Sequence, residues 1–210
     1  MATSEPITAA DPLALLADAI SDVGYWSWWT HELPEVFQVE FGGTQLYFPP
    51  PSADKPPQTQ IALQFQQPTS ISFLSRGVST EDFTWVQQLH DDQLESPGCS
   101  YGEFSFGDEA ALSGLLHAAT QVNTIVGDAP TTEAFLRQPY RLVFWCGDYG
   151  LAIAAPALRL VTHSGSVALD QVADVNRQWW DYWQRYWAHR DTAEPLPHDY
   201  ACEVTIPLKS

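Results

Sequence analysis

Residues 61–75 read IALQFQQPTSISFLS, and this stretch sets the pattern for much of the chain. In its first six residues, Ile, Leu and Phe alternate with Ala or Gln, and after Gln67-Pro68-Thr69 the alternation resumes at Ile71 and Phe73. Such alternation is typical of β-strands with one face in a core and one face in water. The Gln-Pro-Thr interruption predicts that the two strands form a hairpin.

Strand-like segments recur on both sides of this stretch. Gly42-Gly43 separates two of them and predicts a hairpin, as does Gly-Asp-Tyr-Gly at 147–150. The predicted strands are 36–41, 44–48, 61–66, 71–73, 101–106, 139–146, 151–155, 158–163 and 200–206. Hairpins dominate, and helices do not alternate regularly with strands. The sequence therefore predicts an α+β fold with a mostly antiparallel sheet of about seven to nine strands.

About four helices complete the expected fold. Asp11 and Pro12 are typical of a helix start, and Gly24 of its end. A second helix is predicted near 79–89, and a third from Asp108 to Gly127, where Leu112, Leu115, Leu116, Ala119, Val122 and Val126 share one stripe. The fourth helix, 167–190, is rich in tryptophan and is expected to pack on the sheet.

The length of 210 residues suits a single domain spanning 1–210. Within it, we expect a flexible N-terminus at residues 1–10. We also expect a surface loop at residues 49–60, which hold five prolines.

The chain is strongly acidic, with 26 acidic and 9 basic side chains and a formal charge of −17. This composition argues against nucleic acid as a partner, because binding to phosphates needs clustered cations. It argues against anionic membrane surfaces for the same reason. A high negative charge keeps a tryptophan-rich protein soluble, and it also speeds encounter with a basic partner protein.

Targeting signals and cysteines indicate the compartment. The first twelve residues lack Lys and Arg and contain no continuous apolar stretch, so no secretory signal is expected. Cys99, Cys146 and Cys202 are odd in number and lack C-x-x-C spacing. This usage fits a reducing compartment better than a disulfide-stapled exported domain. We therefore expect a cytoplasmic protein.

Residues 169–190, LDQVADVNRQWWDYWQRYWAHR, form the most informative segment for function. On a helix, their apolar and aromatic side chains fall within an arc of roughly 140°. One interpretation packs this stripe entirely against the sheet, because each Trp buries a large area. The other leaves Trp180, Trp183 and Trp187 partly exposed as a surface for a ligand or a partner.

A second aromatic cluster, Tyr25-Trp26-Ser27-Trp28-Trp29, follows the first predicted helix. If Trp28 and Trp29 met the C-terminal helix, the two clusters would line one aromatic groove. A partner's side chains, a sugar or another flat ring system could occupy such a groove.

Acid–base chemistry has one candidate segment, Thr30-His31-Glu32-Leu33-Pro34-Glu35. An imidazole beside carboxylates can move protons, so His31, Glu32 and Glu35 are the catalytic residues of an alternative hypothesis. The H-E-x-x-H spacing of a zinc helix is missing, and Pro34 would break such a helix. The sequence carries no motif for a metal or a cofactor, and we expect neither.

These observations favour a non-catalytic binding protein that uses an aromatic surface. An inhibitor, an immunity-type protein or an assembly factor docking on another protein would fit. Its binding residues are expected to be Trp28, Trp29, Trp180, Trp183 and Trp187, with Glu32 and Glu35 on the rim. The alternative is a small enzyme or ligand carrier that holds a small aromatic-stacking or sugar-like molecule in the same groove.

Overall fold

The computed structural model describes residues 11–20, 25–29, 35–49, 58–76, 94–95, 102–107, 109–130, 132–146 and 149–190. For residues 25–29, 94–95, 102–103, 146, 149 and 189–190 it describes the backbone only. The expected flexible N-terminus, the helix at 79–89, the strand at 200–206 and most of the proline-rich loop lie outside these ranges.

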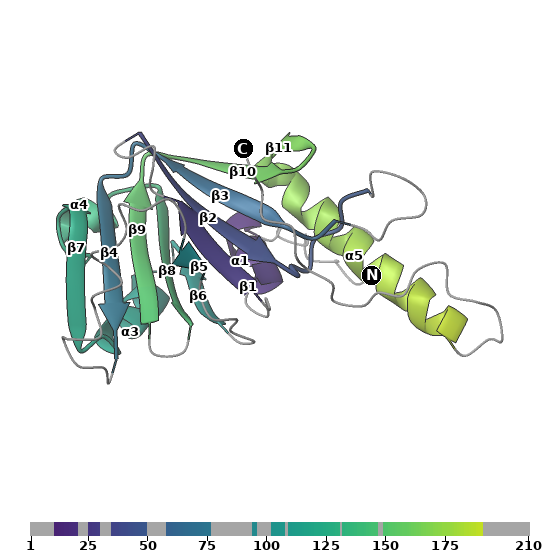
Figure 1. Cartoon of the computed structure of the whole chain (residues 1–210), viewed down its shortest axis with the longest axis horizontal. Helices are drawn as coiled ribbons and strands as arrows, with labels where there is room; N and C mark the ends of the chain where they lie inside the picture. Colours follow the sequence, from purple (N-terminus) through teal and green to yellow (C-terminus); the bar gives the residue numbers. More distant parts are fainter. Residues whose placement is uncertain are drawn as a thin grey trace, which may run out of the picture.

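The strands form two antiparallel sheets (Figure 1). The first sheet has six strands in the order β11-β10-β3-β2-β1-β5, and the second has five in the order β6-β8-β9-β4-β7. In the first sheet these are β1 (Tyr25–Trp29), β2 (Val36–Gly42), β3 (Ile61–Gln66), β5 (Leu94–Glu95), β10 (Ala157–Thr162) and β11 (Gly165–Val167). In the second they are β4 (Ser70–Ser75), β6 (Gly102–Phe106), β7 (Gln121–Gly127), β8 (Tyr140–Cys146) and β9 (Tyr149–Ala155). The predicted α+β class and antiparallel pairing are confirmed, and the strands divide between two sheets.

Two stretches of chain pass from one sheet to the other at a shared corner. β3 continues into β4 through 67–69, and β9 continues into β10 at Pro156. β3 pairs with β10 in the first sheet, and β4 pairs with β9 in the second. Gln67 makes the bend with a positive φ of 49°, and its N–H donates to the carbonyl of Glu35 at 2.6 Å. The hairpin predicted at 67–69 is therefore wrong, because alternation shows which face is buried but not which strand is the neighbour.

The main core lies between the facing sides of the two sheets. It takes every second residue of β2, β3, β4, β8 and β9, together with Leu16 and Ile20 of α1 (Pro12–Ile20). Phe41 of the first sheet contacts Phe104 and Phe144 of the second edge to face, with ring centroids 5.6 and 5.8 Å apart. Phe104 and Phe144 stack at 5.1 Å. Each such aromatic pair contributes about 0.5–1.5 kcal/mol beyond its buried area.

A smaller core covers the outer side of the second sheet. It contains Leu74, Val143, Trp145, Ala152 and Ala154, beneath α3 (Glu109–His117) and α4 (Glu133–Leu136). The Trp145 indole N–H donates to the carbonyl of Leu115 of α3 at 2.9 Å. Burial on both faces explains the near-continuous apolar sequences of β8 and β9.

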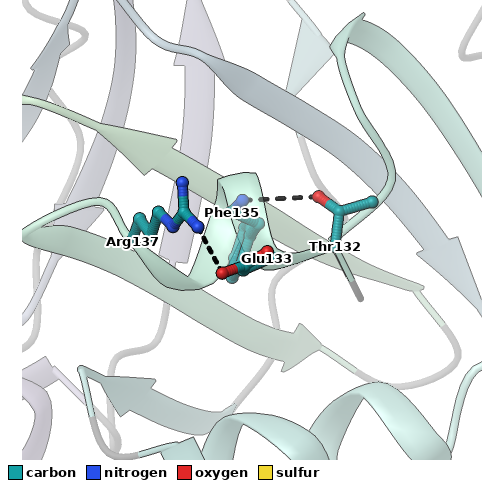
Figure 2. Close-up of polar contacts among 4 residues, drawn as sticks. All are labelled: Thr132, Glu133, Phe135 and Arg137. Carbon is teal, nitrogen blue, oxygen red and sulfur yellow. Dashed lines mark hydrogen bonds and ion pairs between the residues drawn. The ribbon is translucent and has the colours of Figure 1, made fainter.

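Helix α4 is one turn long and begins at a capping side chain. The hydroxyl of Thr132 accepts a hydrogen bond from the backbone N–H of Phe135 at 3.3 Å, while Glu133 and Arg137 form an exposed ion pair (Figure 2). The cap satisfies one of the N–H groups that the first turn leaves without a helical partner. Phe135, 1% exposed, fills the smaller core.

The third helix differs from its prediction. α3 ends at His117, and Gln121–Gly127 form strand β7 instead of two further helical turns. Val122 and Val126 therefore belong to a strand that pairs with β4. Four of the five residues Val-Asn-Thr-Ile-Val are β-branched and favour a strand, and pairing with β4 outweighs the helical spacing of the apolar residues.

Other local predictions have mixed outcomes. Asp11 caps α1, since its carboxylate accepts from the Leu13 N–H at 3.0 Å. The hairpin at 147–150 is confirmed, because β8 and β9 pair. Gly42-Gly43 does not make a hairpin: residues 44–47 lie in no strand, and Phe48 forms only an isolated bridge with Gln58.

Two glycines provide a matched stability test. A Cβ at Gly127, where φ is +65°, would lie 1.8 Å from the carbonyl oxygen of Thr69, whereas a Cβ at Gly114 of α3 would have nothing within 4 Å. We expect Gly127→Ala to lower the free energy of unfolding by about 2–5 kcal/mol, through the left-handed backbone and the clash. Gly114→Ala should raise it by about 0.5–1 kcal/mol, because alanine favours a helix. Urea unfolding measures both changes, and equal stability of the two variants would contradict the described end of β7.

Candidate binding surface on helix α5

The tryptophan-rich helix α5 (Val172–Arg190) is held to the molecule through its first half. Val172 is fully buried and belongs to the main core. The side-chain amide of Asn176 donates to the carbonyl of Gln45 at 2.8 Å, and the N–H of Tyr47 donates to the carbonyl of Val175 at 3.1 Å. From these contacts the helix runs away from the two sheets (Figure 1).

The tryptophans of α5 differ in exposure along the helix. Trp179 is 6% exposed, whereas Trp180 and Trp187 are 49% and 46% exposed. Trp183 is half-buried. Both interpretations of the stripe therefore hold in part. The helix packs on the main core through Val172 and buries Trp179, and it presents indole surface to solvent at Trp180 and Trp187.

Ring contacts order the aromatic side chains of α5. Trp183 stacks on Trp187 with centroids 5.8 Å apart and an angle of 21° between the rings. Trp179 meets Trp183 edge to face at 5.6 Å, and Tyr186 meets Trp183 at 5.2 Å. These contacts follow the spacing of three or four residues that brings helical side chains together. We call Trp179, Trp180, Tyr182, Trp183, Tyr186 and Trp187 the aromatic face.

Tyr182 and Tyr47 also belong to this aromatic arrangement, although the sequence did not lead us to predict either residue as part of it. The two rings lie 5.7 Å apart, and Tyr182 also stacks on Tyr186 at 6.5 Å. The spacing of Tyr182 and Tyr186 could have indicated the second contact. Tyr47 comes from a segment far earlier in the chain than α5, and no local pattern in the sequence indicates that the two rings meet.

The charged side chains of α5 lie beside the aromatic face rather than within it. Arg177 and Asp174 form an exposed ion pair at 2.6 Å. The Nε–H of Arg185 donates to the backbone carbonyl of Asp181 at 3.2 Å. Asp174, Arg177, Asp181 and Arg185 are all exposed. An exposed pair of this kind contributes little to stability, roughly 0–1 kcal/mol.

The other predicted binding residues lie elsewhere or outside the description. Trp28 and Trp29 belong to β1, where their backbones pair with Val39 and Gln38. Glu35 is exposed and precedes β2 at the corner of the sheets, the opposite end of β2 from the 44–48 segment that holds α5. His31 and Glu32 lie outside the described residues. The structure thus brings together Trp180, Trp183 and Trp187, and it leaves the aromatic groove and the acid–base cluster untested.

A polar row crosses the opposite face of the first sheet from the main core. The Gln64 amide donates to the Gln38 side-chain oxygen at 2.7 Å, and the Gln38 amide donates to the Glu40 carboxylate at 2.7 Å. Glu40 is only 1% exposed. This arrangement orients a carboxylate, but such burial leaves it little access to a substrate.

Comparison of this chain with known proteins finds no relative, because no family model, curated protein or solved structure matches it. Within the described ranges, no group of three or more His, Cys, Asp or Glu side chains could hold a metal ion. None of the helices searched in the described part is both long and apolar enough to cross a membrane.

Trp179 and Trp180 are neighbours with different expected roles. Trp179→Ala should lower the free energy of unfolding by about 3–5 kcal/mol, because it removes a buried ring. Trp180→Ala should lower it much less, by about 1 kcal/mol, because about half of this side chain is already in contact with water. Urea unfolding of both variants checks the assignment. A large loss in Trp180→Ala would show that this side chain is part of the core.

Tyr182 provides a test through pH. Burial raises its pKa, with smaller increases from Tyr47 and Tyr186 and an opposing decrease from Arg185. A raised pKa means that the folded state holds the phenolic proton more tightly. This stability is therefore present below about pH 10 and is lost as the pH rises through the folded pKa. Between pH 9 and pH 11.5 the wild type should lose unfolding free energy faster than Tyr182→Phe does, and parallel losses would contradict the packing of this ring.

Proposed function

We propose that this protein is a non-catalytic binding protein that docks on another protein through the aromatic face of α5. The observation that carries the proposal is the exposure of Trp180 and Trp187, 49% and 46%, on a helix whose C-terminal half extends away from the two sheets. Large exposed apolar side chains in soluble proteins often mark interaction sites when they gather in one patch. Tryptophan is also among the residues most enriched in binding hot spots.

The geometry of the aromatic face supports tight binding. Trp187 is stacked on Trp183, which in turn contacts Trp179 in the anchored half of the helix. Side chains that are already held in place lose less conformational entropy when a partner covers them. The aromatic face therefore offers a large, ordered contact area at low entropic cost.

The proposed partner carries a basic surface. The chain has a formal charge of −17, and this field attracts a basic protein over a distance. An arginine of the partner can also stack on an exposed indole. We place the protein in the cytoplasm, because its three cysteines are odd in number and lack C-x-x-C spacing. The roles that fit are an inhibitor, an immunity-type protein or an assembly factor.

The test begins with native mass spectrometry of the protein purified gently from its own host. We expect a co-purifying basic protein, which then serves as the ligand in calorimetry. Trp180→Ala and Trp187→Ala should each weaken binding by about 30-fold, the effect of losing a hot spot of about 2 kcal/mol. Raising the salt concentration should weaken binding further.

Gln178→Ala and Gln184→Ala are the matched controls, because both side chains are exposed on α5 outside the aromatic face. They should leave the affinity within about twofold, a change of roughly 0.4 kcal/mol. Unchanged binding by the Trp180→Ala/Trp187→Ala double variant, with the helix intact by circular dichroism, would refute the proposal.

A further inference from the structure

Strand β7 is the outermost described strand on one side of the second sheet, at the end of the molecule opposite to the far end of α5 (Figure 1). It pairs with β4 on one side, and no described strand pairs with its other side. An edge strand presents a row of backbone N–H and C=O groups that can pair with another extended chain.

The side chains of β7 do not protect this edge. Residues 121–127 contain no charged residue and no proline, the two commonest obstacles to edge pairing. Val122 and Ile125 are 47% and 36% exposed, and they are the only large hydrophobic residues of the described part, besides Trp180 and Trp187, with such exposure. The register with β4 shifts between Ile71 and Ser72, so Ile125 is the extra residue of a β-bulge, whereas residues 121–124 pair with β4 without interruption.

The other edges of the two sheets differ from β7. In the first sheet, β5 has two residues and β11 has three, too short to pair extensively with another chain. In the second sheet, β6 packs beside α1 and α3. β7 has seven residues, and β4 is the only described element with which it makes extensive contacts. Among the described strands, β7 is therefore the one suited to pairing with an added strand.

We propose that the β7 edge binds an extended segment of a basic partner protein by antiparallel strand addition. The row of backbone groups favours a strand as the occupant, and the exposed Val122 and Ile125 favour a strand that carries apolar side chains. The negative charge of this chain indicates which molecule supplies the added strand. A second copy would bring together two chains of −17 each, whereas a segment flanked by Lys or Arg is attracted to the chain and to exposed Asp128 beside β7.

This proposal rests on β7 and on the charge of the chain, and it does not depend on the aromatic face. Its probe is a fluorescein-labelled peptide of sequence KTVTVTK, measured by fluorescence anisotropy with the full chain. Two further peptides carry N-methyl groups on alternate backbone amides, one in each phase. Because an added strand uses only one edge for pairing, one phase should abolish binding, and the other should retain it.

Charge and location are tested separately. The peptide ETVTVTE should bind at least about tenfold more weakly than KTVTVTK, a difference of about 1.4 kcal/mol. Binding of KTVTVTK should slow hydrogen exchange of the amides within 122–126. Val122→Lys should weaken binding about tenfold, whereas Ser113→Lys, which adds the same charge on exposed α3, should leave it within about twofold.

Several results would overturn the proposal. These are no binding of KTVTVTK, equal binding of both N-methylated phases, or equal effects of the two lysine variants. A protein dimer that Val122→Lys dissociates would also overturn it, because a second copy would then occupy the edge. Unchanged unfolding curves for both lysine variants ensure that each loss reflects binding.

Discussion

The shared bend of two chain segments holds this structure together. Residues 61–75 and 149–162 run antiparallel to each other, pair as β3 and β10 in one sheet, and pair again as β4 and β9 in the other. Two interior strands of each sheet, β3 and β10 in the first and β4 and β9 in the second, are therefore joined directly along the chain. Because the sheets meet at this corner, their facing sides are brought together and bury the aromatic contacts of Phe41, Phe104 and Phe144.

This constraint also determines which surfaces stay open. The second sheet is covered on its outer side by α3 and α4, so β8 and β9 are buried on both faces. In the described part of the chain, two apolar features remain exposed, the aromatic face of α5 at one end and the edge of β7 at the other. The exposed side chains of these two features do not pack in the core, and both proposals of function rest on this exposed apolar surface.

The sequence predicted individual elements better than it predicted their neighbours. Asp11, the hairpin at 147–150 and the aromatic stripe of α5 follow from local rules for caps, turns and helical spacing, and the structure bears them out. The hairpin at 67–69 and the helix through Val126 are wrong for a common reason. Apolar spacing shows which side of a segment is buried, but pairing with a distant strand decides whether that segment bends between sheets or becomes a strand.

The sequence by itself determined the α+β class, the antiparallel pairing, the acidic charge and the gathering of Trp180, Trp183 and Trp187 on one helical face. The class and the pairing follow from the order of short strands and helices along the chain, and the other two properties follow from composition and from the helical period of 3.6 residues. Only the tertiary structure decided that Trp179 is buried while Trp180 and Trp187 are exposed, and that β7 ends its sheet. The exposure of each tryptophan depends on which part of α5 is covered by the rest of the protein. The position of β7 at the side of its sheet depends on the order of the strands. Both are set by contacts between residues far apart in the chain, such as Asn176 with Gln45 and β4 with β7.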